Sequence, residues 1–237
     1  MEKTSNTQLM IPLSILGAGV IIAGAIFLTA QSNNGDQLAG TGGVQEEAIS
    51  NITSVTPKDH ILGNFETAEV FIVEFSDLEC PFCKSFHQTL KQVVESYGPD
   101  GEVAWVYRHF PLTSIHPKAY QEAVATECAA ELGGELKFWE YMDRLLEITP
   151  SNNGLDLTLL PQIAEDIELD RDAFIECLES GRQESAVNED TEDAVKSGGR
   201  GTPHSILITK DGKDSMRVQG AQPFDVLKAQ IDQLLNE

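Results

Sequence analysis

Cysteine is scarce in this chain of 237 residues, which contains only four. Two of them, Cys80 and Cys83, form a Cys-x-x-Cys pair, and the chain has no second pair and no His-x-x-x-His spacing. Structural zinc sites need four ligands and usually draw them from two such pairs. We therefore expect neither a metal site nor a bound cofactor.

Basic residues are also few, since 16 Lys and Arg oppose 38 Asp and Glu, giving a formal net charge of -22. Nucleic acids and anionic lipid surfaces attract Lys and Arg, so this balance argues against both as partners. Acidic residues are dense between Glu165 and Asp193, where Arg171 and Arg182 are the only basic residues. We expect a solvated helical face there, with a docking surface for a basic partner as the alternative.

Charge is absent from residues 9–30, an apolar run long enough to span the hydrocarbon core of a bilayer. A cleaved signal peptide has a shorter apolar region followed by small residues, so the pattern favours an uncleaved transmembrane anchor. Lys3 precedes the run, and no Lys or Arg follows it before Lys58. The positive-inside rule then predicts a cytoplasmic tail at residues 1–8, a single pass through the cell membrane, and the rest of the chain on the extracytoplasmic side.

Large apolar side chains are rare in residues 31–57, which are rich in Gly, Ser, Asn, Thr and Gln. This composition predicts a flexible linker. The remaining residues, 58–237, are numerous enough to build the core of one domain.

The Cys-x-x-Cys pair follows the apolar run Val70–Phe75, which predicts a buried strand. Pro81 suits the first turn of a helix, where its missing N–H costs nothing. Cys80 is therefore expected at a helix N-terminus, where unpaired backbone N–H groups and the helix dipole stabilise a thiolate. Cys83 lies one turn along and can resolve a mixed disulfide formed at Cys80. The pattern predicts a redox-active dithiol.

Further segments predict an α/β chain. Glu102–Tyr107 is expected to be a second strand, and helical spacing dominates from Pro117 to Lys196. The order then predicts a hairpin, from Ser205–Thr209 to Met216–Val218, and a closing amphipathic helix at Pro223–Leu235.

The segment from Gly63 to Cys83, with Glu74-Phe75-Ser76-Asp77 and Cys80-Pro81-Phe82-Cys83, resembles the DsbA-like thiol-disulfide oxidoreductases of bacterial envelopes. The similarity continues, in the family's order and at similar spacing, at Tyr107–Leu112, Glu127–Ala130, Phe138–Tyr141 and Gly201–Pro203. It covers roughly residues 58–237. The resemblance implies a thioredoxin-like α/β fold with an inserted all-helical subdomain at about 113–197.

The resemblance also implies roles for residues outside the cysteine pair. Thr202-Pro203 is similar to a cis-proline dipeptide that exposes backbone beside Cys80 for pairing with an extended substrate. From the residues alone, an ordinary trans turn would be expected. Glu74 matches a buried acid that exchanges a proton with Cys83. The alternative is that Glu74 points to solvent on an alternating strand.

The other two cysteines each fall in a predicted helix, Lys118–Leu132 for Cys128 and Asp170–Gly181 for Cys177. An even number of cysteines fits two disulfides in an oxidising compartment. Similarly spaced cysteines in some relatives, and the expected export, favour a structural disulfide between Cys128 and Cys177. Two buried free thiols are the alternative.

Two features weaken the expectation of strong oxidising power. The dipeptide Pro81-Phe82 between the cysteines lacks the imidazole donor found in the strongly oxidising relatives, which argues against extreme oxidising power. Glu79, directly before Cys80, adds a like charge that would oppose thiolate formation unless its side chain turns to water.

We expect an enzyme that introduces disulfides into exported proteins through Cys80 and Cys83 and is reoxidised by a membrane-bound redox partner. An envelope reductase or isomerase would use the same residues if the reduced form were less stabilised. A non-catalytic peptide-binding module, or one that holds Cu(I) through both sulfurs, is the alternative from another class. The linker shows no dimerisation segment, which favours a monomeric oxidase.

Overall fold

The computed structural model describes residues 51–98 and 100–236. The predicted cytoplasmic tail at 1–8, the predicted anchor at 9–30 and the linker up to residue 50 lie outside these residues. Within the described part of the chain, no helix combines the length and the apolar character needed to cross a bilayer.

The core of the domain is a five-stranded sheet in the order β1-β3-β2-β4-β5. Its strands are β1 (His60–Leu62), β2 (Val70–Ser76), β3 (Val103–His109), β4 (His204–Thr209) and β5 (Ser215–Gln219). Strands β2 and β3 are parallel, whereas the other three pairs are antiparallel. The strand, the second strand and the hairpin that the sequence predicts are all present, and β1 is an additional edge strand.

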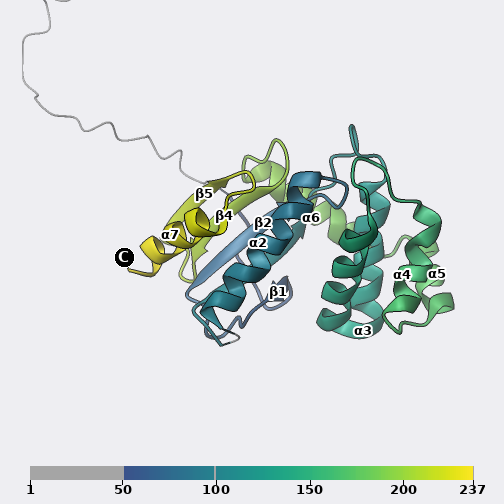
Figure 1. Cartoon of the computed structure of the whole chain (residues 1–237), viewed down its shortest axis with the longest axis horizontal. Coiled ribbons are helices and arrows are strands. Elements are labelled where there is room, and N and C mark those ends of the chain that lie inside the picture. The colour runs from purple at the N-terminus through teal and green to yellow at the C-terminus, as the bar shows by residue number, and fades with distance from the viewer. Residues whose placement is uncertain (1–50, 99, 237) are drawn as a thin grey trace, which may run out of the picture. The chain divides into compact units, whose positions relative to one another are not determined.

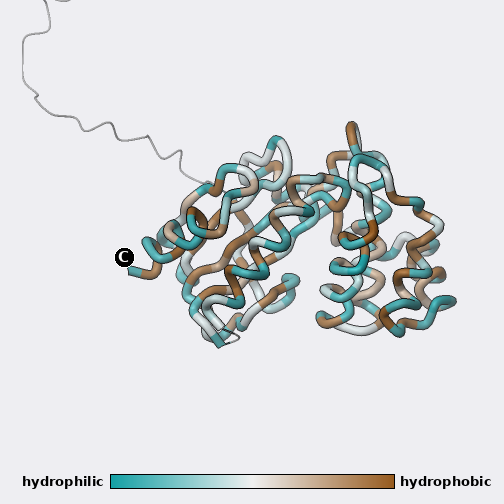
Figure 2. The backbone as a smooth tube through the Cα atoms, viewed as in Figure 1, coloured by the Kyte–Doolittle hydropathy of each residue, from teal (hydrophilic) through white to brown (hydrophobic). Residues whose placement is uncertain are grey.

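Alternating side chains of β2 divide the core between the two faces of the sheet. Val70 and Ile72 pack with helices α2 (Pro81–Tyr97) and α7 (Phe224–Leu235), and Phe71 and Val73 lie in a second cluster with Ala194 of α6 (Glu184–Lys196). Figure 1 shows α2 and α7 side by side over the sheet. Figure 2 shows hydrophobic and hydrophilic residues alternating along both helices, as expected for helices that pack one face on a sheet. Both faces of β2 are therefore covered, which explains its uninterrupted apolar sequence.

The insertion between β3 and β4 is entirely helical. It contains α3 (Ala119–Ile148), the short 3-10 helix η1 (Leu157–Leu159), α4 (Leu160–Asp166), α5 (Arg171–Ser180) and α6. Helices α3, α4 and α5 pack together beside the sheet (Figure 1). The strand order and this insertion confirm the expected thioredoxin-like α/β fold with a helical subdomain.

Local signals set the ends of these helices. Asp170 caps α5, accepting a hydrogen bond from the Ala173 N–H at 2.8 Å, and Gly181 ends the helix with a left-handed φ of 66°. Gly134 breaks α3 with a φ of 74°, so the two halves of this helix run in different directions.

The predicted boundary between linker and domain at residue 58 needs correction. Ile52 and Val55 pack against the β2 cluster, and Thr53 donates hydrogen bonds to the Asp193 carboxylate from its N–H at 2.9 Å and its hydroxyl at 2.6 Å. Arg108 of β3 donates to the Thr53 carbonyl at 3.0 Å. Residues 52–57 therefore belong to the packed domain, because a buried charge network holds them.

The same network corrects part of the prediction of a solvated acidic face. Asp193 is buried and pairs with Arg108 at 2.7 Å. Asp190 accepts a hydrogen bond from the backbone N–H of His109 at 2.8 Å. These carboxylates of α6 face the sheet, since they satisfy donors on β3 that would otherwise be buried without partners.

Candidate active site

The cysteine pair lies where β2 gives way to α2. Cys80 is the N-cap residue of α2, with an extended backbone (φ -80°, ψ 119°), and Pro81 is the first helical residue. The first turn of a helix leaves backbone N–H groups without intrahelical acceptors. The side chain of Cys80 therefore sits where those N–H groups point, as the sequence predicts.

The two thiols of the pair differ in acidity. Hydrogen bonding from the Cys83 thiol, helped by the backbone N–H groups of Cys83 and Phe82, lowers the pKa of Cys80 to about 6, although burial acts in the opposite direction. Burial raises the pKa of Cys83 well above its ordinary value, and the nearby Cys80 and Glu74 charges add to this effect. Cys80 is thus a thiolate near neutral pH, while Cys83 keeps its proton. This asymmetry is what a nucleophile and a resolving thiol require.

Thr202 and Pro203 lie next to Cys80 although they are far away in the sequence. The peptide bond between them is cis, as the resemblance implies. The thiol of Cys80 lies 3.5 Å from the carbonyl oxygen of Thr202. Because β4 begins at His204, the sheet fixes this segment relative to α2. The backbone at Thr202, which can pair with an extended peptide, is therefore held beside the sulfur of Cys80.

Glu74 is buried on β2 rather than exposed to solvent. Its side chain is 1% exposed, and burial raises the pKa of Glu74 to about 8. Ser76 donates a hydrogen bond to the Glu74 carboxyl at 2.9 Å, which opposes part of this rise. The Glu74 charge also contributes to the raised pKa of Cys83. A carboxyl with this pKa can accept or return a proton near neutral pH.

Glu79 does not behave as its position beside Cys80 predicts. Its side chain does not turn to water, because it is fully buried. The carboxylate accepts hydrogen bonds from the backbone N–H groups of Asn153, Gly154 and Leu155. Its charge is directed into the loop that follows α3, so the N-terminus of α2 remains free to stabilise Cys80.

The dipeptide between the cysteines is on the surface. Phe82 is 65% exposed and Pro81 is also exposed, whereas both cysteines are almost completely covered. An exposed aromatic side chain at this position gives an incoming chain an apolar contact next to Cys80.

Sequence reasoning missed Asp77 and His116. Asp77 is buried and accepts hydrogen bonds from the N–H groups of Glu79 at 2.8 Å and Leu112 at 2.7 Å. Its second oxygen also contacts Nδ1 of His116 at 3.0 Å. The local signal was present, because Asp directly after a strand commonly accepts from the backbone two residues on. The long-range partners had no sequence signal.

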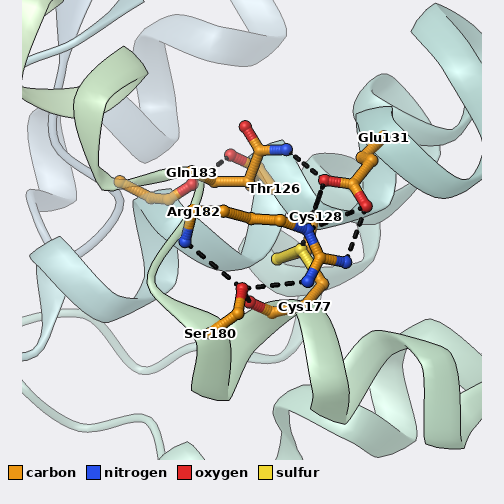
Figure 3. Close-up of a disulfide and its surroundings, with 8 residues drawn as sticks. Thr126, Cys128, Glu131, Cys177, Ser180, Arg182 and Gln183 are labelled. Atoms are coloured by element: carbon orange, nitrogen blue, oxygen red, sulfur yellow. Dashed lines mark hydrogen bonds and ion pairs between the residues drawn. A yellow bond between two sulfur atoms is a disulfide. The ribbon is translucent and has the colours of Figure 1, made fainter.

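The second cysteine pair forms a disulfide that joins α3 to α5. Cys128 and Cys177 are fully buried, with an S–S distance of 2.03 Å. Figure 3 shows Arg182 and Gln183 reaching over this bond toward Glu131, with Arg182 2.7 Å from the Glu131 carboxylate. The pair that the resemblance implies is thus present, and it is separate from the Cys80 site.

The described residues contain no cluster of three or more His, Cys, Asp or Glu side chains arranged to hold a metal ion. The Nε2 atom of His109, at the end of β3, lies 3.0 Å from a carboxylate oxygen of Glu127.

Comparison with known proteins gives concordant results for the domain. The model of a thioredoxin family matches residues 55–233. The crystal structure of Pseudomonas aeruginosa DsbA2 is 29% identical, with a TM-score of 0.65 over 78% of this chain and 98% of that chain. The oxidised form of Bacillus subtilis BdbD shares the fold, with 22% identity and a TM-score of 0.64 over 76% of this chain and 94% of that chain.

Curated relatives of a different kind also match. The Na⁺/H⁺ antiporter NhaA 1 of Salinispora arenicola is 35% identical over 190 residues, which are 80% of this chain and 27% of that protein. NhaA 3 of Salinispora tropica is 36% identical over 162 residues, 68% of this chain and 23% of that protein. The chain therefore spans about a quarter of the length of these relatives. The matched family model shows that the chain belongs to the thioredoxin family, and its fold is similar to that of the DsbA proteins.

Proposed function

We propose that this protein donates disulfides to exported polypeptides. The observation that carries the proposal is the position of Cys80 at the N-terminus of α2, 3.5 Å from the Thr202 carbonyl oxygen, with the pKa of Cys80 lowered to about 6 and that of Cys83 raised. A stabilised Cys80 thiolate stabilises the reduced form of the protein, and a stable reduced form makes the disulfide a better oxidant.

The reaction follows from the positions of these groups. A thiolate of the substrate attacks Sγ of Cys80 in the Cys80–Cys83 disulfide, and the sulfur of Cys83 leaves with the electron pair. Glu74 supplies the proton that Cys83 then takes up. A second substrate thiolate attacks the substrate sulfur of the mixed disulfide, and Cys80 leaves as a thiolate. The substrate loses two electrons and the protein gains them.

The backbone at Thr202 and Pro203 would hold the substrate segment during the exchange. An extended peptide can add to this edge through main-chain hydrogen bonds. In the proposed role these two residues bind and orient the substrate, while Cys80, Cys83 and Glu74 carry out the chemistry.

The proposal extends to location and partners. The uncharged run at residues 9–30 supports a single-pass anchor in the cell membrane, with the oxidoreductase domain on the extracytoplasmic side. Repeated turnover needs an oxidant that accepts the two electrons, for which we propose a membrane-bound redox partner.

A direct assay tests this function. The oxidised full-length protein is mixed with a reduced, unfolded polypeptide that contains two cysteines, and the appearance of the polypeptide disulfide is followed by mass spectrometry after thiol trapping. We expect one disulfide to form for each protein molecule consumed, and none with Cys80→Ser. Reduction of an oxidised polypeptide by the dithiol form, without the forward reaction, would instead support the envelope reductase.

A further inference from the structure

A row of buried polar side chains crosses three strands of the sheet. Glu74 of β2 lies in register with Tyr107 of β3 on one side and with Ser205 of β4 on the other. Residues in register on neighbouring strands point to the same face of a sheet, and the strands are about 4.8 Å apart. Glu74 therefore has a side chain with a hydroxyl group as its direct neighbour on both sides.

The face of the sheet that carries this row is closed to solvent. Tyr107 belongs to the same core cluster as Phe86 and Leu90 of α2, which cover this face. Tyr107 is 2% exposed and Ser205 is 0% exposed. Bulk water does not reach these hydroxyls, so the hydrogen bonds that they make must be to groups inside the domain.

Three polar atoms of the row lack a partner. The hydroxyl oxygens of Tyr107 and Ser205 form no hydrogen bond with any described residue, and neither does Oε2 of Glu74. The other carboxyl oxygen of Glu74 accepts a hydrogen bond from Ser76 at 2.9 Å. A buried polar atom without a partner raises the free energy of the folded state. Two unused donors thus lie on either side of a carboxyl group that has an unused acceptor.

The proposed reaction requires such donors. When Cys83 leaves the disulfide as a thiolate, the O–H bond of Glu74 breaks and an S–H bond forms at Cys83. The negative charge therefore moves from the sulfur to the Glu74 carboxylate. An ionised carboxylate as deeply buried as Glu74 has a high free energy unless it is hydrogen-bonded. Ser76 supplies one hydrogen bond, whereas a carboxylate has about four acceptor positions.

Both hydroxyls can donate to the charged form of Glu74. Burial raises the pKa of Tyr107 well above its ordinary value, and the charges of Glu74 and Cys83 add to this effect. Tyr107 therefore keeps its proton while Glu74 titrates. Ser205 does not ionise, and its hydroxyl hydrogen can rotate toward an acceptor.

We propose that Tyr107 and Ser205 are positioning residues for the proton transfer, and that they donate hydrogen bonds to the Glu74 carboxylate that forms when Cys83 takes up its proton. The inference rests on the proposed function, because that reaction makes Glu74 ionise. Hydrogen bonds to the charged form of an acid lower its pKa. The two hydroxyls therefore oppose the effect of burial and make Glu74 a better proton donor to Cys83.

Other titratable groups surround this row, and a test must separate them from Glu74. Cys80 is one of them, since its charge helps to raise the pKa of Glu74. His204 of β4 lies on the other face of the sheet, where it stacks on Phe75, and the buried side chains of α7 are apolar. In the oxidised protein neither Cys80 nor Cys83 titrates. The remaining groups on the facing elements are His87 on α2, Asp77 directly after β2 and His109 on β3, which pair with Asp143, His116 and Glu127.

A carboxyl titration of the oxidised full-length protein tests the inference without a substrate. The side-chain carboxyl carbons of Glu are labelled with ¹³C, and the NMR signal that disappears in Glu74→Gln identifies Glu74. We expect Tyr107→Phe to raise the pKa of Glu74 by about one unit, which makes it a tenfold weaker acid. Ser205→Ala should shift the pKa in the same direction. An unchanged pKa of Glu74 in both variants would overturn the proposal.

Tyr141→Phe is the matched control. Tyr141 is also fully buried, but its hydroxyl donates to the carbonyl oxygen of Leu160 at 2.9 Å, within the helical insertion. Loss of this hydroxyl should leave the pKa of Glu74 at its wild-type value. An equal rise in Tyr141→Phe would mean that the loss of any buried hydroxyl has this effect, and the proposal would then be wrong.

Urea denaturation of the oxidised protein separates positioning from a structural role. At about pH 5, where Glu74 is protonated, Tyr107→Phe should be no less stable than the wild type, because the hydroxyl that it removes has no partner. At about pH 9, where Glu74 is ionised, the variant should be less stable than the wild type. An equal loss of stability at both pH values would show a structural hydroxyl and would contradict the proposal.

The assay of disulfide transfer distinguishes failure of this inference from failure of the proposed function. A wild-type protein that does not oxidise a reduced polypeptide would reject the proposed function, and with it the role of both hydroxyls in proton transfer. Wild-type oxidation together with an unchanged pKa of Glu74 in Tyr107→Phe and Ser205→Ala would reject the positioning role alone.

Discussion

The two cysteine pairs of this protein are both buried, yet their surroundings give them opposite properties. Cys80 lies at the N-terminus of α2, where N–H groups and the Cys83 thiol lower its pKa to about 6. Cys128 and Cys177 lie within α3 and α5, without access to a helix N-terminus, and are already joined to each other. The difference teaches that the position in the helix, and not burial, determines which pair is reactive.

The two cysteine pairs also differ in what surrounds them. The reactive pair is next to an exposed Phe82 and to the backbone of Thr202. Over the Cys128–Cys177 bond, Arg182 and Gln183 both bind Glu131 (Figure 3). One pair is thus built for exchange and the other for stability.

The largest expected effect separates the pairs by reactivity. Cys80→Ser should lower the rate of thiol-disulfide exchange by several orders of magnitude, because it removes the sulfur that the substrate thiolate attacks. The double variant Cys128→Ala/Cys177→Ala should retain the wild-type rate with dithiothreitol. Both are measured by stopped-flow exchange with the full-length protein, and comparable losses in the two variants would contradict the division.

The second prediction separates the pairs by stability. The Cys128–Cys177 bond closes a separation of 49 residues, and its removal in Cys128→Ala/Cys177→Ala should lower the free energy of unfolding by about 2–4 kcal/mol. Urea denaturation measures this change. Reduction of the Cys80–Cys83 disulfide alone should not destabilise the protein, and a comparable loss there would argue against the proposed oxidising role.

The third prediction concerns pH and follows from the lowered pKa of Cys80. At Cys80 the folded dithiol form binds fewer protons than the unfolded chain between pH 6 and 9, so this thiol should contribute a rise in stability with pH across this window, seen as the difference from Cys80→Ser. Thiolate absorbance in the ultraviolet should titrate with a midpoint near 6 and should vanish in Cys80→Ser. A midpoint near the ordinary cysteine value would show that the helix N-terminus does not activate Cys80.

The fourth prediction uses the raised pKa of Glu74. In the folded protein Glu74 stays protonated up to about pH 8, whereas in the unfolded chain it ionises near its ordinary value of 4.5. In the oxidised protein, where Cys80 does not titrate, Glu74 should therefore contribute a fall in stability as pH rises between 4.5 and 8, and Glu74→Gln should lose this contribution. The release of Cys83 should also lose its pH dependence near 8 in the variant. Rates in Glu74→Gln that follow the wild-type pH profile would exclude Glu74 from the proton transfer.

The smallest effect is expected at the surface of the structural pair. Arg182→Gln removes an exposed ion pair with Glu131, and such pairs contribute little because water screens them. We expect no measurable change in the urea midpoint. A clear loss would mean that the Arg182 cover stabilises the Cys128–Cys177 region more than its exposure indicates.

Local features explain what could be predicted from the sequence. The strand-turn-helix arrangement around Cys80 depends on residues close in the chain, and the ends of α5 depend on Asp170 and Gly181. The cis bond before Pro203 and the pairing of Cys128 with Cys177 were implied by the family resemblance and not by the residues alone.

Long-range contacts explain what could not be predicted. The side chain of Glu79 is separated from its Asn153 partner by 74 residues, and Thr53 is separated from Asp193 by 140. No local pattern indicates such partners, so the sequence missed the partners of Glu79 and misassigned residues 52–57 to the linker. The strand β1 was missed because three residues are too few for a periodic signal.

The redox potential of the Cys80–Cys83 couple tests the central claim most directly. The full-length protein is equilibrated with graded glutathione buffers, its thiols are trapped, and the dithiol fraction is measured by mass spectrometry. Because Cys80 is activated but no imidazole lies between the cysteines, we expect a potential between the roughly -120 mV of the strongest oxidants and the roughly -180 mV of protein disulfide isomerase. A value near the roughly -270 mV of thioredoxin would contradict the account, because the protein would then reduce its targets.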